Sequence, residues 1–238
     1  ITVNDDAGDT LNATDLSTLG GKTAATATVS NAVVISGTQA QVTAALVTDE
    51  TKVTASNALV TISDNAGVNL NAEDLSAIGG ATGGTVTVTN AVNIQGTQAQ
   101  VTAALVTDET KVTASTATVE LDDGETPSIT QLNNIAAAAG VVTASLAANS
   151  LSNLGALTTA STDQITITVN DDAATNVNAE DLSALGGKTA ATVTVSNAVN
   201  IQGTTDQVTA ALVTDDSLVV AASATVELDD ASTVAELN

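Results

Sequence analysis

The chain has 238 residues, enough for one large core or two modest domains, and its 27 acidic residues against four lysines give a net charge of −23. This balance leaves no basic patch for nucleic-acid phosphates or anionic membrane surfaces, so we expect neither nucleic-acid binding nor membrane insertion. Cys, His, Met and all aromatic residues are absent, which excludes disulfides and thiol metal sites. The core is therefore built from Val, Ile, Leu and Ala, small side chains that suit an architecture of stacked, repeated elements.

A repeated segment dominates the sequence. GTQAQVTAALVTDETKVTAS occupies residues 37–56 and recurs without a change at residues 96–115, and an altered copy begins at Gly203. Short stretches with apolar residues at every second position recur at intervals of 26 and then 33 residues, which add to a 59-residue repeat. The extra seven residues of the longer interval correspond approximately to the DETKVTA segment. Such a period predicts stacked coils, because one coil cannot bury its own apolar edge.

We predict nine coils, each with a strand, an Asx-containing turn, a second extended piece and a helix of about two turns. The last inward residues of the first strands are Val3, Val29, Ile62, Val88, Leu121, Leu146, Val169, Val195 and Leu228. The coils start near residues 1, 26, 59, 85, 117, 141, 165, 192 and 224, and the coil over 141–164 is irregular. Together they predict a single continuous solenoid over residues 1–238.

The helix starts carry local capping signals. In chain order these begin at Asn12, Thr38, Asn71, Thr97, Ser128, Asn178 and Thr204. Thr38, Thr97, Ser128 and Thr204 have a Gln three residues later and predict capping boxes, whereas the three Asn residues predict simple N-caps. The glycine pairs 20–21, 79–80 and 186–187 predict left-handed helix ends.

Strands joined by such helices are expected to run parallel with right-handed crossovers. The predicted fold is therefore an α/β repeat solenoid, a right-handed parallel β-solenoid with a short helix in each coil and a 59-residue double-coil repeat. In this fold each inward residue lies over its counterpart in the next coil. Thr residues between the inward positions point outward.

Asx residues stand two positions after the last inward residue of eight coils. They are Asp5, Asn31, Asp64, Asn90, Asp123, Asp171, Asn197 and Asp230. Stacked coils place such side chains about 4.8 Å apart, and a neutral Asn between two Asp residues reduces repulsion. We predict a structural ladder of Asx side chains that holds the turns.

Calcium binding is the competing interpretation of these turns. Hard oxygen ligands suit calcium, and the candidate ligands are Asp5, Asp64, Asp123, Asp171 and Asp230. No known calcium-loop motif is present, so solvated turn acids are the simpler interpretation, with no cofactor. Outward threonines at 85–89 and 166–168 resemble a surface-binding array, but Glu120 and Glu227 interrupt it.

Catalysis has little support in the residue types. Without His, Cys, Tyr or Arg, the candidate groups are carboxylates, lysines and hydroxyls, and nothing implies a cleft between adjacent Asp pairs. The four lysines follow helices and are expected to pair with neighbouring acids. We therefore predict a protein without enzymatic activity.

A family resemblance covers nearly the whole chain. The segments VNLNAEDLSAIGGATGGTVTVTNAVNIQGTQAQVTAALVT and SLSNLGALTTASTDQITITVNDD resemble repeats of giant extracellular, cell-surface proteins of marine unicellular cyanobacteria, some of them linked to swimming motility. The resemblance implies an extracellular, structural, repetitive protein with calcium in its surroundings, and it transfers no catalytic residue.

The expected function is a structural module of a surface layer or secreted filament, cut from a longer chain. Open strand edges at Val3 and Leu228 would pair head to tail with further copies or adjoining repeats. The alternative is an adhesin that holds a glycan, calcium or a crystal surface on its Thr and Asx faces.

Overall fold

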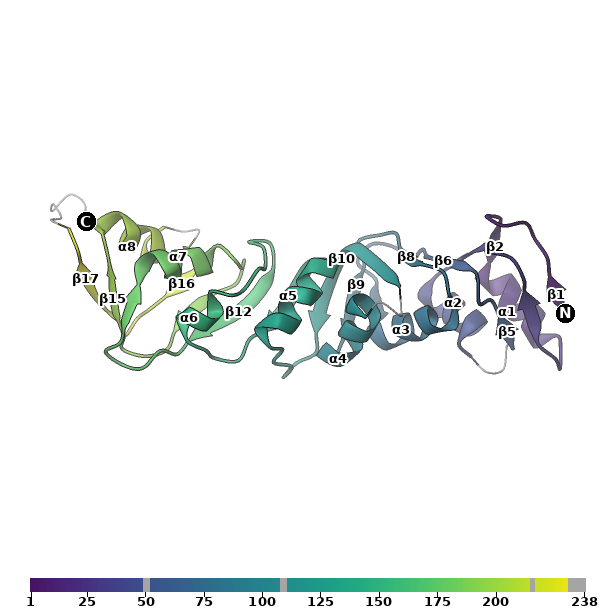
Figure 1. Ribbon diagram of the computed structural model, residues 1–238, viewed down its shortest axis with the longest axis horizontal. Helices are drawn as coiled ribbons and strands as arrows, with labels where there is room; N and C mark the ends of the chain where they lie inside the picture. Colours follow the sequence, from purple (N-terminus) through teal and green to yellow (C-terminus); the bar gives the residue numbers. More distant parts are fainter. Residues whose placement is uncertain (49–51, 108–110, 215–216, 231–238) are drawn as a thin grey trace. The chain divides into compact units, whose positions relative to one another are not determined.

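The computed structural model describes residues 1–48, 52–107, 111–214 and 217–230. It is an α/β fold whose described part contains eight α-helices and one π-helical turn, and Figure 1 labels the α-helices. The chain divides into two compact units. Unit 1 comprises residues 1–123 and 137–141, and unit 2 comprises residues 124–136 and 142–238.

Unit 1 alternates short strands with short helices. Its strands are β1 (Thr2–Val3), β2 (Thr10–Asn12), β3 (Ala27–Val29), β4 (Val34–Gly37), β5 (Val53–Thr54), β6 (Leu59–Ile62), β7 (Asn69–Asn71), β8 (Val86–Val88), β9 (Asn93–Gly96) and β10 (Val112–Leu121). Its helices are α1 (Ala13–Gly21), α2 (Gln39–Leu46), α3 (Ala72–Ala81), α4 (Gln98–Val101) and the π-helical η1 (Thr102–Val106). Helix α5 (Ile129–Ala138) and strand β11 (Ala139–Ser145) contain residues of both units.

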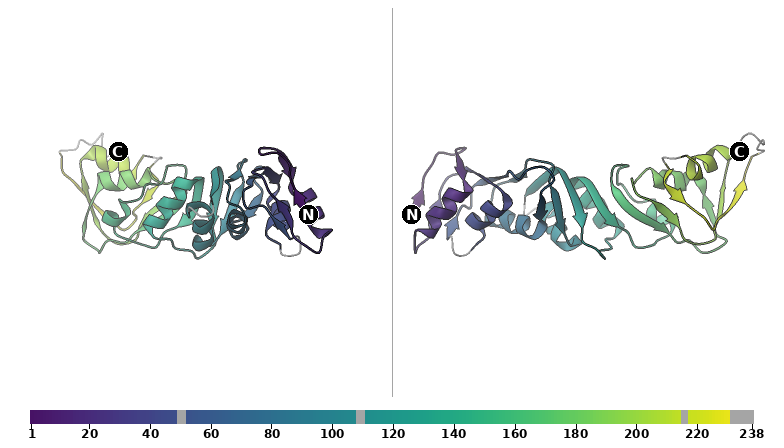
Figure 2. Two further views of the ribbon diagram at one scale, coloured as in Figure 1. Left: turned by 45° about the vertical axis from the view of Figure 1, so that its right-hand side comes forward. Right: turned by 180° about the vertical axis from the view of Figure 1, so that it is seen from behind.

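Unit 2 repeats the same alternation. Its strands are β12 (Gln164–Val169), β13 (Asn176–Asn178), β14 (Val193–Val195), β15 (Asn200–Gly203), β16 (Val219–Val220) and β17 (Thr225–Leu228). Its helices are α6 (Leu151–Leu154), α7 (Ala179–Gly186) and α8 (Thr205–Leu212). Helices α7 and α8 pack against each other in this unit, as α1 and α2 do in unit 1 (Figure 2).

Strand pairs within the described part of each unit are parallel. In unit 1, β3 lies between β1 and β5, so that Thr28 pairs with both Thr2 and Thr54. A second row runs β2, β4, β6, β8 and β10, and a third runs β7, β9 and β10. Unit 2 has the corresponding rows β12, β14, β16 and β13, β15, β17. The parallel arrangement expected from the strand–helix alternation is confirmed.

The expected stacking of like residues holds only inside each pair of coils. Val3 pairs with Val29, and Ile62 pairs with Val88. Between pairs the prediction is wrong, because Ile62 pairs with Gly37. The reason is that the DETKVTA segment contains strand β5 in its described part. Strand β5 pairs with β3, so β6 pairs instead with β4 in the second row.

The apolar core of each unit forms where strand and helix side chains meet. In unit 1, Val86 and Ile94 from the strands and Leu75 and Ile78 from α3 are fully buried. In unit 2, Ile201, Leu182 and Leu185 are equally inaccessible. Burying a side chain of this size contributes roughly 1.5–3 kcal/mol relative to solvent exposure, so packing stabilises helices too short to persist alone.

The predicted helix starts are confirmed by their hydrogen bonds. Thr38, Thr97 and Thr204 form capping boxes with the Gln three residues later, and Ser128 exchanges the same two bonds with Gln131. The side chains of Asn12, Asn71 and Asn178 accept backbone N–H bonds from the first turns of α1, α3 and α7. Local chemistry alone fixes these positions.

The predicted left-handed glycine ends are wrong. Helix α1 runs to Gly21 and its C-cap Lys22 has φ −88°, and α7 runs to Gly186 and its C-cap Gly187 has φ −68°. The pair 79–80 lies inside α3, and none of these glycines has a positive φ. Gly186 is required for a different reason, because a Cβ atom there would overlap the carbonyl oxygen of Ser217. The glycine in α7 therefore permits close packing of the segment before β16.

Candidate functional site

The Asn members of the predicted ladder bind the backbone of the preceding turn. Their side-chain Nδ2 groups donate to the carbonyl oxygens of the Asp residues 26 positions earlier. The bonds run from Asn31 to Asp5 at 2.6 Å, from Asn90 to Asp64 at 2.6 Å and from Asn197 to Asp171 at 2.8 Å. Each Asn thus ties two successive turns together through an amide donor.

The Asp members bind the first N–H of a helix. Asp64 Oδ2 accepts from Gln39 N at 2.6 Å, and Asp171 Oδ2 accepts from Leu151 N at 2.7 Å. Asp230 Oδ1 accepts from Thr205 N at 3.0 Å and from the Thr205 hydroxyl at 2.9 Å. A carboxylate at this place satisfies an orphan donor and complements the positive end of the helix dipole.

These bonds explain why Asp and Asn alternate. A position that faces a carbonyl needs a donor, which Asn supplies, and a position that faces a helix N–H needs an acceptor, which Asp supplies. The side chains therefore belong to two kinds of bond, instead of one continuous ladder whose spacing is set by charge repulsion. Asp5 and Asp123 lie exposed at their turns.

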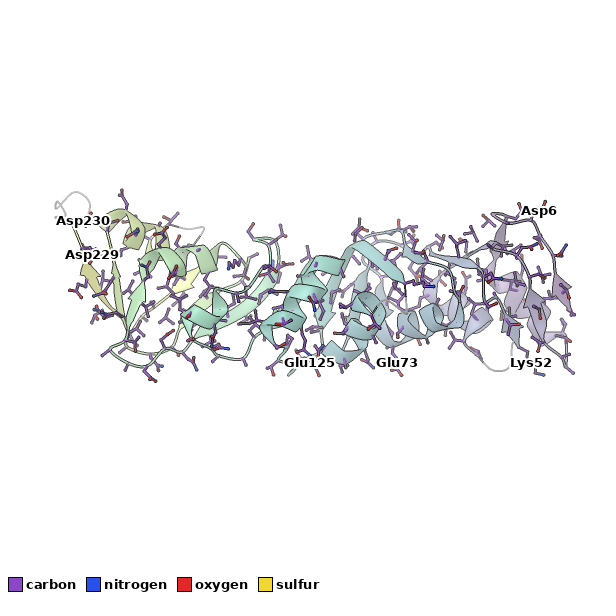
Figure 3. All side chains as sticks on the ribbon, viewed as in Figure 1. Asp6, Lys52, Glu73, Glu125, Asp229 and Asp230 are labelled. Atoms are coloured by element: carbon purple, nitrogen blue, oxygen red, sulfur yellow. The ribbon has the colours of Figure 1, made fainter. Side chains whose placement is uncertain are left out.

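The Asp residues proposed as calcium ligands do not form one cluster of oxygen donors in the described part of the chain. Asp64, Asp171 and Asp230 each serve a different helix. Within residues 1–48, 52–107, 111–214 and 217–230, no group of three or more Asp or Glu residues is placed to hold a metal ion. Acidic side chains such as Asp6 and Glu73 instead lie separately on the outside of the fold (Figure 3). Calcium binding by the five predicted Asp residues stays a prediction.

Three lysines bind backbone carbonyls. The ammonium groups of Lys52, Lys111 and Lys188 donate to the carbonyl oxygens of Ala24, Gly83 and Gly155 at 3.1, 2.5 and 2.7 Å. Each bond joins segments 28 or 33 residues apart. Each of these bonds joins two successive turns, and the expected pairing of lysines with neighbouring acids stays a prediction, because the acids at 49–50 and 108–109 lie outside the described residues.

The described part of each unit contains a carboxylate–amide cluster, a glutamate that accepts hydrogen bonds from two side-chain amides. In unit 1, Glu120 Oε2 accepts from Asn93 Nδ2 at 3.0 Å and from Gln95 Nε2 at 2.6 Å. Asn93 Nδ2 also donates to Asn69 Oδ1 at 3.1 Å. The bonds from Asn93, and then from Gln95, favour the ionised carboxylate and lower the pKa of Glu120.

The unit 2 copy of this cluster has the same bonds. Glu227 accepts from Asn200 at 2.9 Å and from Gln202 at 2.7 Å, which lowers its pKa in the same way. Both glutamates interrupt the outward threonines, as the sequence indicated. The strands of the cluster are thereby joined by side chains as well as by the backbone ladder.

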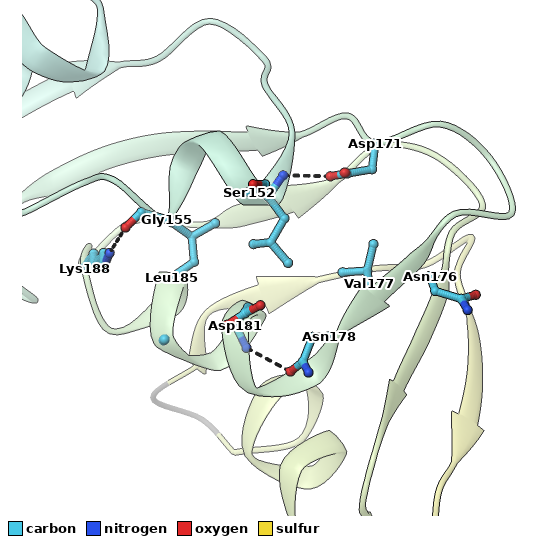
Figure 4. A pocket seen from close by; sticks show the side chains of 11 residues that line it. Ser152, Gly155, Asp171, Asn176, Val177, Asn178, Asp181, Leu185 and Lys188 are labelled. Atoms are coloured by element: carbon cyan, nitrogen blue, oxygen red, sulfur yellow. Dashed lines mark hydrogen bonds between the residues drawn. The ribbon is translucent and has the colours of Figure 1, made fainter.

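A cavity of about 450 Å³ opens beside α6 and α7 in unit 2. Leu151, Val177 and Leu185 form its apolar part, and Asp171, Asp181 and Lys188 contribute charged groups to its lining. Figure 4 shows Lys188 and Asp171 at opposite ends, with Leu185 beside Lys188 and Val177 below Asp171. Helix α6 has only four residues, whereas α2 has eight.

The equivalent place in unit 1 is filled by one side chain. Gln39, which is 7% exposed, donates from Nε2 to the Asn71 carbonyl at 2.7 Å and accepts at Oε1 from the Asn71 N–H at 3.0 Å. Gln39 and Leu151 both occupy the first position of their helix and both give their N–H to the Asp of the next turn. Leu151 has no amide to make the other two bonds.

Sequence reasoning missed Gln39, Leu151 and the glutamate clusters. The hydrogen-bond partners of these residues lie 20–32 positions away in the sequence, and no local motif predicts such bonds. A 107-residue offset places Asp64 on Asp171 and Asn71 on Asn178, but it places Gln39 on Leu146, so comparison of the repeat copies does not align Gln39 with Leu151.

Comparison with protein-family models, curated proteins and solved structures finds no match for this chain. The resemblance to cyanobacterial surface repeats therefore stays a prediction. In the part of the chain that the structure describes, no helix combines the length and the apolar character needed to cross a bilayer.

Proposed function

We propose that the chain is a non-catalytic structural repeat module of a large extracellular surface or filament-forming protein. In this proposal it forms a right-handed parallel β-solenoid of about nine coils with a 59-residue double-coil repeat. Its partners are adjoining repeats or further copies stacked head to tail. It needs no cofactor.

The observation that carries this proposal is the set of bonds between successive turns. An Asn amide reaches back to an Asp carbonyl, and an Asp carboxylate reaches back to a helix N–H, in unit 1 and again in unit 2. These Asn amides and Asp carboxylates thus hold one turn against the next. Repeated contacts of this kind suit a protein whose task is to maintain an extended arrangement of repeats.

The residue types also support a structural role. The chain has no His or Cys to serve as a base or nucleophile, and three of its turn carboxylates, those of Asp64, Asp171 and Asp230, are engaged with helix starts. The net charge of −23 favours solubility and opposes sideways clumping of the coils. Surface labelling of intact source cells with an antibody against the chain tests the extracellular placement, and labelling only after permeabilisation would contradict it.

Lengthening the repeat tests the solenoid. A duplicate of residues 60–118, inserted after Thr118, adds one 59-residue repeat in phase with the sequence. A solenoid gains two strand spacings, so small-angle scattering should show a maximum dimension longer by about 10 Å with an unchanged cross-section. A flexible Gly/Ser insert of the same length is the control. A thicker particle without this gain in length would contradict the proposal.

The surface-binding alternative has one observation in its favour. Thr2, Thr28 and Thr54 lie in register on adjacent strands with exposed side chains, and the Thr54 hydroxyl donates to that of Thr28 at 3.5 Å. An ordered row of hydroxyls suits a glycan or a crystal surface. A glycan array together with calcium calorimetry separates this adhesin function from a purely structural one.

A further inference from the structure

We propose that the cavity of unit 2 binds a small molecule that ends in a primary carboxamide and carries a zwitterionic head, the chemistry of free glutamine. The inference goes beyond the structural role of the repeats. It rests on the comparison of one place in the two units, where unit 1 holds a carboxamide of its own and unit 2 holds a cavity.

Unit 1 shows the recognition chemistry directly. The Gln39 carboxamide faces the backbone of Asn71 with its oxygen on the N–H and its nitrogen on the carbonyl. A primary carboxamide fits because it presents a donor and an acceptor side by side. The Asn71 carbonyl has a second lone pair for this bond beyond the one used inside α3.

Unit 2 presents the same backbone edge at Asn178. Asn71 ends β7, which pairs with β9, and Asn178 ends β13, which pairs with β15. The first residue of β9, Asn93, donates its N–H to the Val68 carbonyl just before β7 at 2.9 Å. The first residue of β15, Asn200, donates in the same way to the Thr175 carbonyl just before β13, also at 2.9 Å. Alternate residues of a strand face opposite sides. The backbone groups of Asn178 therefore face away from β15, as those of Asn71 face away from β9 toward Gln39. Asn178 lines the cavity.

The rest of the cavity matches the remainder of the ligand. Leu151, Val177 and Leu185 are buried and offer an apolar surface for a short aliphatic stem. Asp181 on α7 supplies a carboxylate for the ammonium group, and Lys188, beyond its bond to the Gly155 carbonyl, has further N–H donors for the carboxylate (Figure 4). Asp171, at the far end of the cavity, is engaged with the Leu151 N–H. The cavity of about 450 Å³ lies in the range of small-molecule sites.

Titration calorimetry of the full chain with L-glutamine tests the proposal. We expect one site, and at least about tenfold weaker binding of L-glutamate, because its carboxylate replaces the N–H donor that faces the Asn178 carbonyl. Equal affinities for the two amino acids, or no measurable binding of L-glutamine, would overturn the proposal. Equal binding of N-acetyl-L-glutaminamide would overturn the free amino acid as ligand, since it lacks the charged head.

Two variants locate the site. Leu151→Gln supplies the carboxamide internally, as in unit 1, and should reduce L-glutamine affinity at least about tenfold. Ala184→Leu extends an exposed side chain of α7 at the cavity wall and should weaken binding without touching the backbone edge. Ala222→Leu, exposed and outside the cavity lining, is the matched control. Circular dichroism checks each fold, and undiminished binding in both cavity variants would place the ligand elsewhere.

Discussion

At the start of α2 in unit 1, the side chain of Gln39 bridges to the next helix cap, whereas at the start of α6 in unit 2 the equivalent Leu151 leaves a cavity. The backbone bond from this position to the Asp of the next turn is nearly the same in both units, 2.6 Å from Gln39 and 2.7 Å from Leu151. The two junctions thus share their backbone connection and differ in what fills the space beside it.

The comparison shows that the backbone bond to Asp and the side chain at the first helical position have separate roles within one repeat. The Asp-to-helix bond maintains the connection between turns even where the helix shrinks to four residues. The side chain at the first helical position is then free to vary without loss of that connection. A repeat array can therefore carry a specialised place in one copy while its neighbours remain structural.

Converting one junction into the other should give the largest effect. Gln39→Leu removes two hydrogen bonds from a buried position and leaves the Asn71 N–H without its acceptor. We expect a loss of about 2–3 kcal/mol in the free energy of unfolding of unit 1, since each bond contributes about 1 kcal/mol and an unsatisfied donor adds to the cost. Urea denaturation measures the change.

Amide hydrogen exchange gives the matched control for this variant. In the wild type the Asn71 amide should be protected and the Asn178 amide should exchange faster, because only the first has a glutamine acceptor. Gln39→Leu should make Asn71 resemble Asn178, and Leu151→Gln should do the reverse. Equal protection of the two amides in the wild type would show that the junctions do not differ as described.

Exchanging Asn for Asp at the turns should give an intermediate effect. Asn90→Asp removes the donor to the Asp64 carbonyl and places a carboxylate against that oxygen, and Asn197→Asp does the same at Asp171. We expect each variant to lose about 1–2 kcal/mol in the free energy of unfolding. The measurement is urea denaturation at neutral pH.

The reverse exchange is the control for the donor argument. Asp64→Asn keeps an acceptor oxygen for the Gln39 N–H and loses only the charge, so it should cost less than Asn90→Asp. If both exchanges cost the same, charge repulsion along the turns would explain the alternation better than donor and acceptor matching.

The sequence predicted the parts of the fold that depend on neighbours along the chain. Capping residues such as Thr38 and Asn71 act on backbone groups two or three positions away, so their motifs suffice. The move of β6 into a new row was not predictable in this way, because it depends on which of two nearby strands pairs with β3. Pairing of this kind is decided by tertiary contacts.

The candidate site was only partly visible in the sequence for the same reason. The Asx positions were identified by counting from each strand, but their partners are a carbonyl 26 residues away or a helix start 20 to 25 residues away. The cavity of unit 2 is lined by Leu151 and Ser152 of a four-residue helix, which forms no motif.

Acid titration of the two glutamate clusters should give the smallest effect. Hydrogen bonds from Asn93 and Gln95 lower the pKa of Glu120 in the folded chain, while in the unfolded chain it titrates near about 4.3. A lowered folded pKa adds stability that is present above the unfolded pKa and is lost as the pH falls through the folded pKa. Glu120→Gln should therefore flatten the fall in the thermal midpoint of unit 1 between about pH 5 and pH 3.

Glu227→Gln extends this test to unit 2, where bonds from Asn200 and Gln202 lower the pKa of Glu227. The equivalent position in the first double coil is Thr61, which has no carboxylate to titrate, so the effect should be confined to the strands of the two clusters. Asp6→Asn at an exposed turn removes the same charge and is the control. If all three variants kept the wild-type pH profile, the amides would be holding the glutamates in place without favouring their ionised form.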